Sequence, residues 1–350
     1  MKKLDRKITL SDAPVVVPQI PVGIYGVGAY LPPMILGNDD FRQLRLSAAE
    51  KIFIDQIAGV KNRHYSADED INDMAVKAAM DALQHSETDA ANVDLVLVTG
   101  VSKDMSRLTP PNSTLIQTKI GAAQAAAMNI DQGFAGMIYT LSVAASFIAS
   151  GFYQTVLVVA SETILKNTPG DNMKALLVGE GAGAFLLKRA DVGFGIQGFH
   201  LSSWEVDDEA GYVKVMGGCN SLFDKGYGIK PFFTVGEGSF EKHKARTEKY
   251  IPQSVKKVLK HLGHEAQNYD LFVFGQKFKG LSEAWARNIG IDYDRVHDTI
   301  ATTACLETAS IPVIIKDAIG KGRLNKGDYL MLSDFGSNWA VASLAMRWCI

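Results

Sequence analysis

The chain has 350 residues, with 36 Lys and Arg against 38 Asp and Glu, so its formal net charge is −2. Hydrophobic residues make up 47% and charged residues 21%, as in ordinary soluble globular proteins, which excludes a disordered chain, a collagen-like chain and a disulfide-rich scaffold. The near-neutral charge disfavours a nucleic-acid partner, since nucleic-acid-binding proteins normally carry a basic excess.

The predicted elements begin after an N-terminal arm, residues 1–20, which contains basic residues and prolines but no long apolar core typical of a signal peptide. Short apolar runs bounded by turn residues are typical of strands buried on both faces. Helical patterns lie between these runs, and the alternation predicts an α/β protein with a largely parallel sheet. The predicted strands are 22–28, 95–101, 155–160, 183–187, 271–274 and 329–332, and the predicted helices are 72–82, 137–150, 254–262 and 281–289.

One stretch, residues 132–161, has no charged side chain and is long enough to raise the question of a membrane span. A transmembrane helix needs about 20 predominantly apolar residues. Gly151 divides this stretch into a helical half and a β-rich half. We therefore interpret it as a buried helix followed by a buried strand, and we expect no membrane partner.

The two halves of the chain share a pattern of a helix, an Asp and a buried strand, at 93–98 and again at 269–274. This repetition predicts an N-terminal half over 21–190 and a C-terminal half over 191–350. Residues 203–250, rich in Gly, Lys, Glu and Phe, break the pattern, and we interpret them as a loop insertion.

The three cysteines, Cys219, Cys305 and Cys349, are far apart and odd in number. None of them lies in a spacing typical of zinc ligands. Reduced thiols in a cytoplasm fit this pattern best. The sequence thus predicts a cytoplasmic protein with neither a metal site nor a bound cofactor.

A glycine-rich turn, Gly-Glu-Gly-Ala-Gly-Ala at 179–184, stands before an apolar run. A phosphate-binding turn needs a strand before the glycines and a helix after them, whereas here a strand follows. We therefore interpret the segment as a tight turn with Glu180 in a structural role. The same residues resemble the GDGAGA turn of the type III ketoacyl-acyl-carrier-protein synthases, which belong to the thiolase superfamily.

Further segments resemble the same family in the same order along residues 21–350. They are 58–64, similar to its TGIxxRH segment; 111–121, similar to its P-S…Q…LG helix; 129–141, similar to its nucleophile segment DINAACAGFxYAL; 310–312, the SIP of its GNTSAASIP motif; and 334–348, similar to its C-terminal FGGGxTWGSxLxRW. The resemblance implies a thiolase-like α/β fold, a duplicated five-layered αβαβα arrangement with mixed central sheets.

The reactive positions depart from the family pattern. The family condenses acyl groups with a Cys nucleophile at a helix N-terminus, supported by a His and an Asn. The resemblance places Phe134 at the Cys position, Gly275 at the His position and Cys305 at the Asn position. A phenyl ring cannot attack a thioester, and glycine has no side chain to exchange a proton. The resemblance therefore implies a degenerate active site with no catalytic residue.

The coenzyme A entrance also departs from the family. The resemblance places Phe53 and Ile57 at its Trp and Arg positions; Phe53 could stack on an adenine, but Ile57 cannot pair with a phosphate. Lys166 falls near another family Arg. Lys277 and Lys279 could add positive charge near the mouth or belong to a solvated face. Phe53, Lys166 and Lys277 are thus the residual candidates for a coenzyme A entrance.

The first functional hypothesis is a catalytically inactive synthase III-like subunit that acts as a structural or docking partner in a multi-subunit acyltransferase. Thiolase-fold proteins pair through a strand and the nucleophile helix, which here predicts a self-dimer or heterodimer through 137–162. Bacterial monoacetylphloroglucinol acetyltransferase, from antibiotic biosynthesis, has this organisation. It combines a synthase III-type subunit with an active thiolase-like subunit and a small OB/zinc-ribbon subunit, and this chain resembles the first by size and by its lost triad.

Two alternatives stay open. Cys305 could be a relocated thioester nucleophile with His297 as its base, although a buried free cysteine is commonly an inert small hydrophobe. Asp131 and Glu307, near the former site, could pair with lysines or face solvent. The third hypothesis is a binding module that holds an acyl-CoA or a small aromatic ligand without turning it over.

Overall fold

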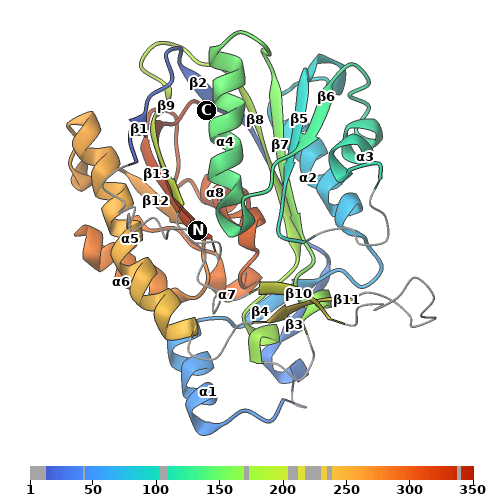
Figure 1. Cartoon of the computed structure of the whole chain (residues 1–350), viewed down its shortest axis with the longest axis vertical. Helices are drawn as coiled ribbons and strands as arrows, with labels where there is room; N and C mark the ends of the chain where they lie inside the picture. The colour runs from blue at the N-terminus through green and yellow to red at the C-terminus, as the bar shows by residue number, and fades with distance from the viewer. Residues whose placement is uncertain are drawn as a thin grey trace, which may run out of the picture.

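The computed structural model describes residues 13–41, 44–102, 109–168, 173–203, 212–216, 230–234, 239–336 and 340–350. Two five-stranded sheets form its centre, with helices between them and on both outer faces (Figure 1). The layers run from α2 and α3 through the first sheet, α4 and α8, and the second sheet to α5 and α6. The expected five-layered αβαβα arrangement with mixed sheets is confirmed.

The first sheet is mixed rather than largely parallel. The strand β5 is parallel to both of its neighbours, β7 and β6, whereas β8 is antiparallel to both β2 and β7. The expectation of a largely parallel sheet is wrong because β8 returns beside β7 against its direction. The strand order is β2 (Val22–Tyr30), β8 (Gly181–Arg189), β7 (Val156–Glu162), β5 (Leu95–Thr99) and β6 (Ala126–Asn129).

The second sheet is mostly antiparallel, and only β12 and β13 run parallel to each other. Its first strand comes from the N-terminal arm, so residues 15–16 are part of the second sheet. The strand order is β1 (Val15–Val16), β9 (Gly195–Ser203), β14 (Ala340–Arg347), β13 (Tyr329–Gly336) and β12 (Leu271–Phe274).

The outer helix α2 (Ile71–His85) starts at Asp70, whose side chain accepts a hydrogen bond from the Asp73 N–H. A carboxylate at this position satisfies one of the unpaired N–H groups of the first turn. The helix lies very close to β2, since a Cβ added to Gly28 would lie less than 3.0 Å from the Ala78 carbonyl oxygen. Small residues on both elements thus bring the helix onto the sheet.

Between the sheets lie α4 (Gly136–Ala149) and α8 (Ser310–Gly320), surrounded by the largest apolar cluster. The charge-free stretch 132–161 therefore contains a mostly buried helix followed by the buried strand β7, as expected. Every helix of the described residues is too short or too polar to cross a membrane.

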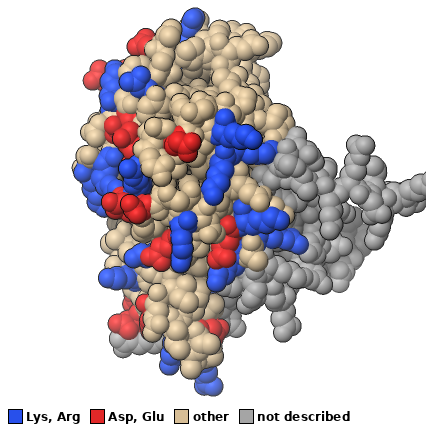
Figure 2. All heavy atoms as spheres, turned by 90° about the vertical axis from the view of Figure 1, so that its left-hand side faces the viewer, with Lys and Arg blue, Asp and Glu red and all other residues tan. Residues whose placement is uncertain are grey.

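The other outer layer contains α5 (Ser239–Leu262) and α6 (Lys279–Ile289). Residues 239–250, expected in a loop insertion, form the first half of α5. Its buried side chains Thr247, Ile251 and Val255 recur at helical spacing, but the polar Thr247 and the internal Pro252 hide the pattern. On the face with these helices, Lys and Arg are interspersed with Asp and Glu, as on a solvated surface (Figure 2).

The remainder of the segment 203–250 is described only in part. It contains the antiparallel pair β10 (Tyr212–Met216) and β11 (Lys230–Thr234), and Cys219 lies outside the described residues. Shorter elements complete the fold: β3 (Met34–Gly37), α1 (Ala48–Ile52), η3 (Phe53–Ala58), β4 (Asn62–Tyr65), α3 (Asn112–Lys119) and α7 (Ile300–Thr303).

Candidate active site

The fold gathers the three positions that the family resemblance singled out. Phe134 lies in the 3-10 turn η5 (Gly133–Ala135) that leads into α4. Gly275 directly follows β12, and Cys305 lies between α7 and the 3-10 turn η10 (Glu307–Ala309). Phe134 and Cys305 belong to one buried apolar cluster.

Phe134 is 5% exposed and packs with Ile164, Leu165 and Val178 beside Cys305. Its ring stands at the start of a helix where the family places a thiolate. A phenyl ring offers neither a nucleophilic atom nor a hydrogen bond. The ring therefore fills this position as part of the core.

Gly275 faces a carboxylate from the neighbouring strand. In the parallel pair β12 and β13, Phe274 lies opposite Ser333, so Asp334 comes beside Gly275. A Cβ added to Gly275 would lie less than 3.0 Å from the Asp334 carboxylate, a separation that real Cβ atoms essentially never show. The completely buried Asp334 thus occupies the space in which a side chain at 275 would begin.

Lys277 connects these residues electrostatically. Its ammonium forms an ion pair with Glu307 and lies 4.0 Å from Asp334 Oδ1. The same nitrogen lies 4.7 Å from the Phe134 ring centroid, within cation–π range. The side chains of Lys277, Glu307 and Asp334 are 20%, 6% and 0% exposed. Lys277 therefore does not belong to a solvated face, and Glu307 pairs with a lysine, one of its two expected roles.

The protonation states follow from burial and these neighbours. Burial lowers the pKa of Lys277, but attraction to Glu307 and Asp334 outweighs it and leaves the pKa above its ordinary value, so the amine stays cationic. Burial raises the pKa of Asp334 to about 7, against the opposing effects of Lys277 and the Phe335 N–H. Burial and then Glu307 raise the pKa of Cys305 well above its ordinary value, so its thiol is protonated at neutral pH.

The backbone around Cys305 is strained and tightly held. Ala304 and Glu307 have φ angles of 56° and 45°, in the left-handed region that non-glycine residues rarely adopt. Cys305 donates its N–H to Leu177 O and accepts from Gly179 N, both at 3.0 Å. These bonds fix the loop that directs Glu307 towards Lys277.

His297, the proposed base for Cys305, is engaged elsewhere. Its Nε2 lies 2.7 Å from Asp317 Oδ2, and its backbone N–H donates to Phe272 O. No hydrogen bond joins His297 to Cys305 in the described part of the chain. The structure thus does not bring together the nucleophile and base of the second hypothesis as a bonded pair.

The candidates for a coenzyme A entrance make separate contacts. Phe53 packs edge-on against Phe278, with ring centroids 5.3 Å apart. Lys166 donates through Nζ to Glu69 O at 2.8 Å and through its backbone N–H to Glu180. With Lys277 held internally by Glu307, the three candidates do not form one cationic entrance.

Sequence reasoning missed Asp334, the residue that blocks position 275. The available signal was a carboxylate two positions after the apolar run 329–332, in a strand whose residues 330–336 are all buried, where a charge is expensive. Among the described residues, no group of three or more His, Cys, Asp or Glu side chains is arranged to hold a metal ion.

Residues 128–204 match the family described as 3-oxoacyl-[acyl-carrier-protein (ACP)] synthase III, and residues 259–348 match the C-terminal part of that family. The chain is 30% identical over 327 residues to β-ketoacyl-[acyl-carrier-protein] synthase III of Xylella fastidiosa strain 9a5c. This alignment covers 93% of the chain and 98% of the Xylella protein.

Two solved structures show the same fold. The 3-oxoacyl-(acyl-carrier protein) synthase of Burkholderia xenovorans LB400 superimposes with a TM-score of 0.86 at 20% identity, over 97% of each chain. The 3-oxoacyl-[acyl-carrier-protein] synthase III of Aquifex aeolicus VF5 superimposes with a TM-score of 0.84 at 22% identity, over 93% of this chain and 100% of that one.

Proposed function

Because the chain belongs to the β-ketoacyl-[acyl-carrier-protein] synthase III family and has its thiolase-like fold, we propose that it is a non-catalytic member that serves as a structural or docking subunit of a multi-subunit acyltransferase. The observation that carries this proposal is the Asp334 carboxylate in the space of a side chain at 275. Phe134 and the Lys277 ammonium occupy the adjoining space.

Condensation of acyl groups needs a nucleophile, a group that exchanges protons and donors that stabilise a developing oxyanion. Here Phe134 has no reactive atom and Gly275 has no side chain. The side-chain amide of the adjacent Gln276 is already engaged, since its Nε2 lies within hydrogen-bond distance of Thr299 Oγ1, Thr303 Oγ1 and the Ala304 carbonyl oxygen. When the members of a cooperating set are lost together, the remaining groups supply little rate enhancement.

The edge of the first sheet supports a docking role, but through a different strand from the one expected. Part of the expected contact region 137–162 is β7, which is hydrogen-bonded on one side to β5 and on the other to β8, so another chain could contact this region through α4 but could not pair with β7. Among the described residues, β2 and β6 are the two edge strands of this sheet, and β6 is the one that leads towards Phe134. Its neighbouring groups Ala126 N and Ile130 N donate to the β5 side, so the alternate Ala127 N–H points outwards.

We propose that the partner docks on β6 and on α4, where Met128 of β6 and Tyr139 and Phe147 of α4 are only partly buried. An exposed strand edge offers backbone groups for another chain, and apolar side chains add buried area. The partner would be an active thiolase-like chain, a second copy of this chain, or both. A small OB/zinc-ribbon subunit would complete an assembly of secondary metabolism. In this assembly, the thiolase-like subunit would transfer an acetyl group to a carbon of an acylphloroglucinol.

The test is reconstitution. The purified chain alone should release no condensation product from acyl-CoA and malonyl-acyl carrier protein, and a thiolase-like subunit encoded beside it should gain activity when the chain is added. Ala127→Pro removes the outward N–H and should weaken that complex, whereas Ala127→Ser keeps the N–H and should not. Turnover by the chain alone that disappears in Cys305→Ala would instead establish the relocated nucleophile.

A further inference from the structure

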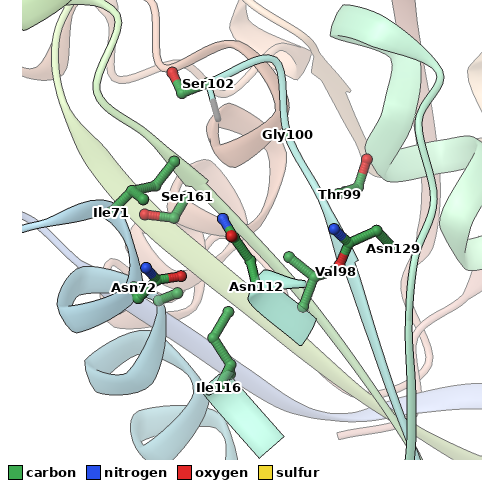
Figure 3. A pocket seen from close by; sticks show the side chains of 11 residues that line it. Ile71, Asn72, Val98, Thr99, Gly100, Ser102, Asn112, Ile116, Asn129 and Ser161 are labelled. Carbon is green, nitrogen blue, oxygen red and sulfur yellow. The ribbon is translucent and has the colours of Figure 1, made fainter. Parts of the chain in front are cut away.

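A small cavity lies at the carboxyl ends of β5 and β6, beside β7 and the first turns of α2 and α3 (Figure 3). Phe134, Gly275 and Cys305 do not line it, so it is separate from the candidate active site. The cavity has a volume of about 20 Å³ for the centre of a water molecule, which is room for about one water.

The wall of the cavity combines amides and hydroxyls from five elements, including Thr99 at the end of β5. Asn72 comes from the first turn of α2, Asn112 from the start of α3, Asn129 from the end of β6 and Ser161 from β7. Figure 3 shows Asn72, Asn112 and Ser161 around the same hollow. The described lining residues include no charged side chain.

Ser161 supplies the observation that points to a ligand. Ser161 is 4% exposed, and its Oγ forms no hydrogen bond with any described residue. A buried hydroxyl without a partner is costly, and such groups in native proteins are usually satisfied by a protein group or by ordered water. The cavity that Ser161 lines has room for such a partner.

The charge of the site selects a neutral ligand. One backbone N–H at the start of each helix is already engaged: Asp73 N donates to Asp70 Oδ1 at 2.8 Å, and Ser113 N donates to Asn129 Oδ1 at 3.1 Å. The described lining residues also include no Lys or Arg, so the site offers an anion neither a cation nor these two N–H groups. A cation would find no carboxylate there.

We infer that this cavity binds one neutral hydrogen-bonding molecule of the size of water, an ordered water held by Ser161 Oγ and the neighbouring amides. Such a water bridges β7 to the first turns of α2 and α3. The cavity wall at Ser102 is held in turn by Glu162, whose carboxylate accepts from Val101 N and Ser102 N at 2.9 Å. The site thus adds a polar link between the outer helices and the end of the sheet.

The sign of a stability change tests the inference. If a water satisfies Ser161, Ser161→Ala removes one of its partners and lowers the urea midpoint of unfolding. If the hydroxyl is unsatisfied, the same change relieves it and raises the midpoint. Ser146→Ala, on the exposed side of α4, controls for the loss of a hydroxyl.

A second pair of measurements keeps the test decisive if Ser161→Ala misfolds. Ala75→Val adds two methyl groups to the cavity wall: it should lower the midpoint by expelling a bound water, and a rise would overturn the inference. A crystal structure of the full chain should show a water within hydrogen-bond distance of Ser161 Oγ. An unoccupied cavity or a larger solute there would equally overturn it.

Discussion

Replacing Lys277 by Ala would remove the cation from a buried charge cluster and leave two carboxylates behind. Glu307 is 6% exposed and Asp334 is 0% exposed, so neither is effectively solvated. Breaking a buried ion pair from one side typically costs about 3–5 kcal/mol. Because Lys277 is itself 20% exposed and Asp334 can take up a proton near neutral pH, we expect the lower end, about 3 kcal/mol.

The assay is urea unfolding at pH 7, followed by circular dichroism. The matched control is Lys279→Ala, which breaks an exposed i,i+4 pair with Glu283 whose side chains are 48% and 44% exposed, and which should cost no more than about 0.5 kcal/mol. Methylammonium should restore part of the lost stability in Lys277→Ala only, because it can bind the carboxylates of the folded state. Equal losses in the two variants would refute the buried charge cluster.

Three more predictions concern the same site. Gly275→Ala should lower the free energy of unfolding by about 1–3 kcal/mol, because its Cβ would clash with the Asp334 carboxylate. The double variant Gly275→Ala/Asp334→Ala should recover part of that loss. If the effects of the two single variants on the free energy of unfolding simply add in the double variant, the clash is refuted. The pKa of Asp334 is raised from 3.8 to about 7, so its stabilising contribution is complete below pH 4 and is lost as the pH rises through 7. Between pH 5 and pH 8 the wild type should lose at most about 3 kcal/mol through Asp334, because about two pH units of this interval lie below its pKa. Asp334→Asn should remove this loss, and an unchanged pH dependence would refute the assignment. Phe134→Cys alone should form no acyl adduct by mass spectrometry, because Gly275 and Cys305 still offer no support for the reaction; an adduct at residue 134 would contradict this account of the other two positions.

Much of the fold was predictable because its strands are buried on both faces. The runs at 95–101 and 271–274 correspond to β5 and β12, since a fully buried strand needs continuous apolar residues. Strand direction was not predictable from such runs, because β8 has the same apolar character whether it is parallel or antiparallel. The first half of α5 was missed for a local reason, since Thr247 and Pro252 interrupt the apolar pattern.

The candidate site was predictable only as a set of aligned positions. The family resemblance brought Phe134, Gly275 and Cys305 together, and the fold places them at one site. What replaces the chemistry could not be predicted, because the contact of Asp334 with position 275 depends on the pairing of β12 with β13. The pairing of Lys277 with Glu307 likewise depends on a loop held in left-handed conformations.

The most direct test of the central claim is the intact mass of the chain after incubation with acetyl-CoA and longer acyl-CoAs, with and without a thiolase-like partner. The buried Phe134 ring and the protonated Cys305 thiol predict no acyl adduct on this chain, and an adduct on the partner. An adduct on this chain, mapped to Cys305, would contradict the account and establish an enzyme with a relocated nucleophile.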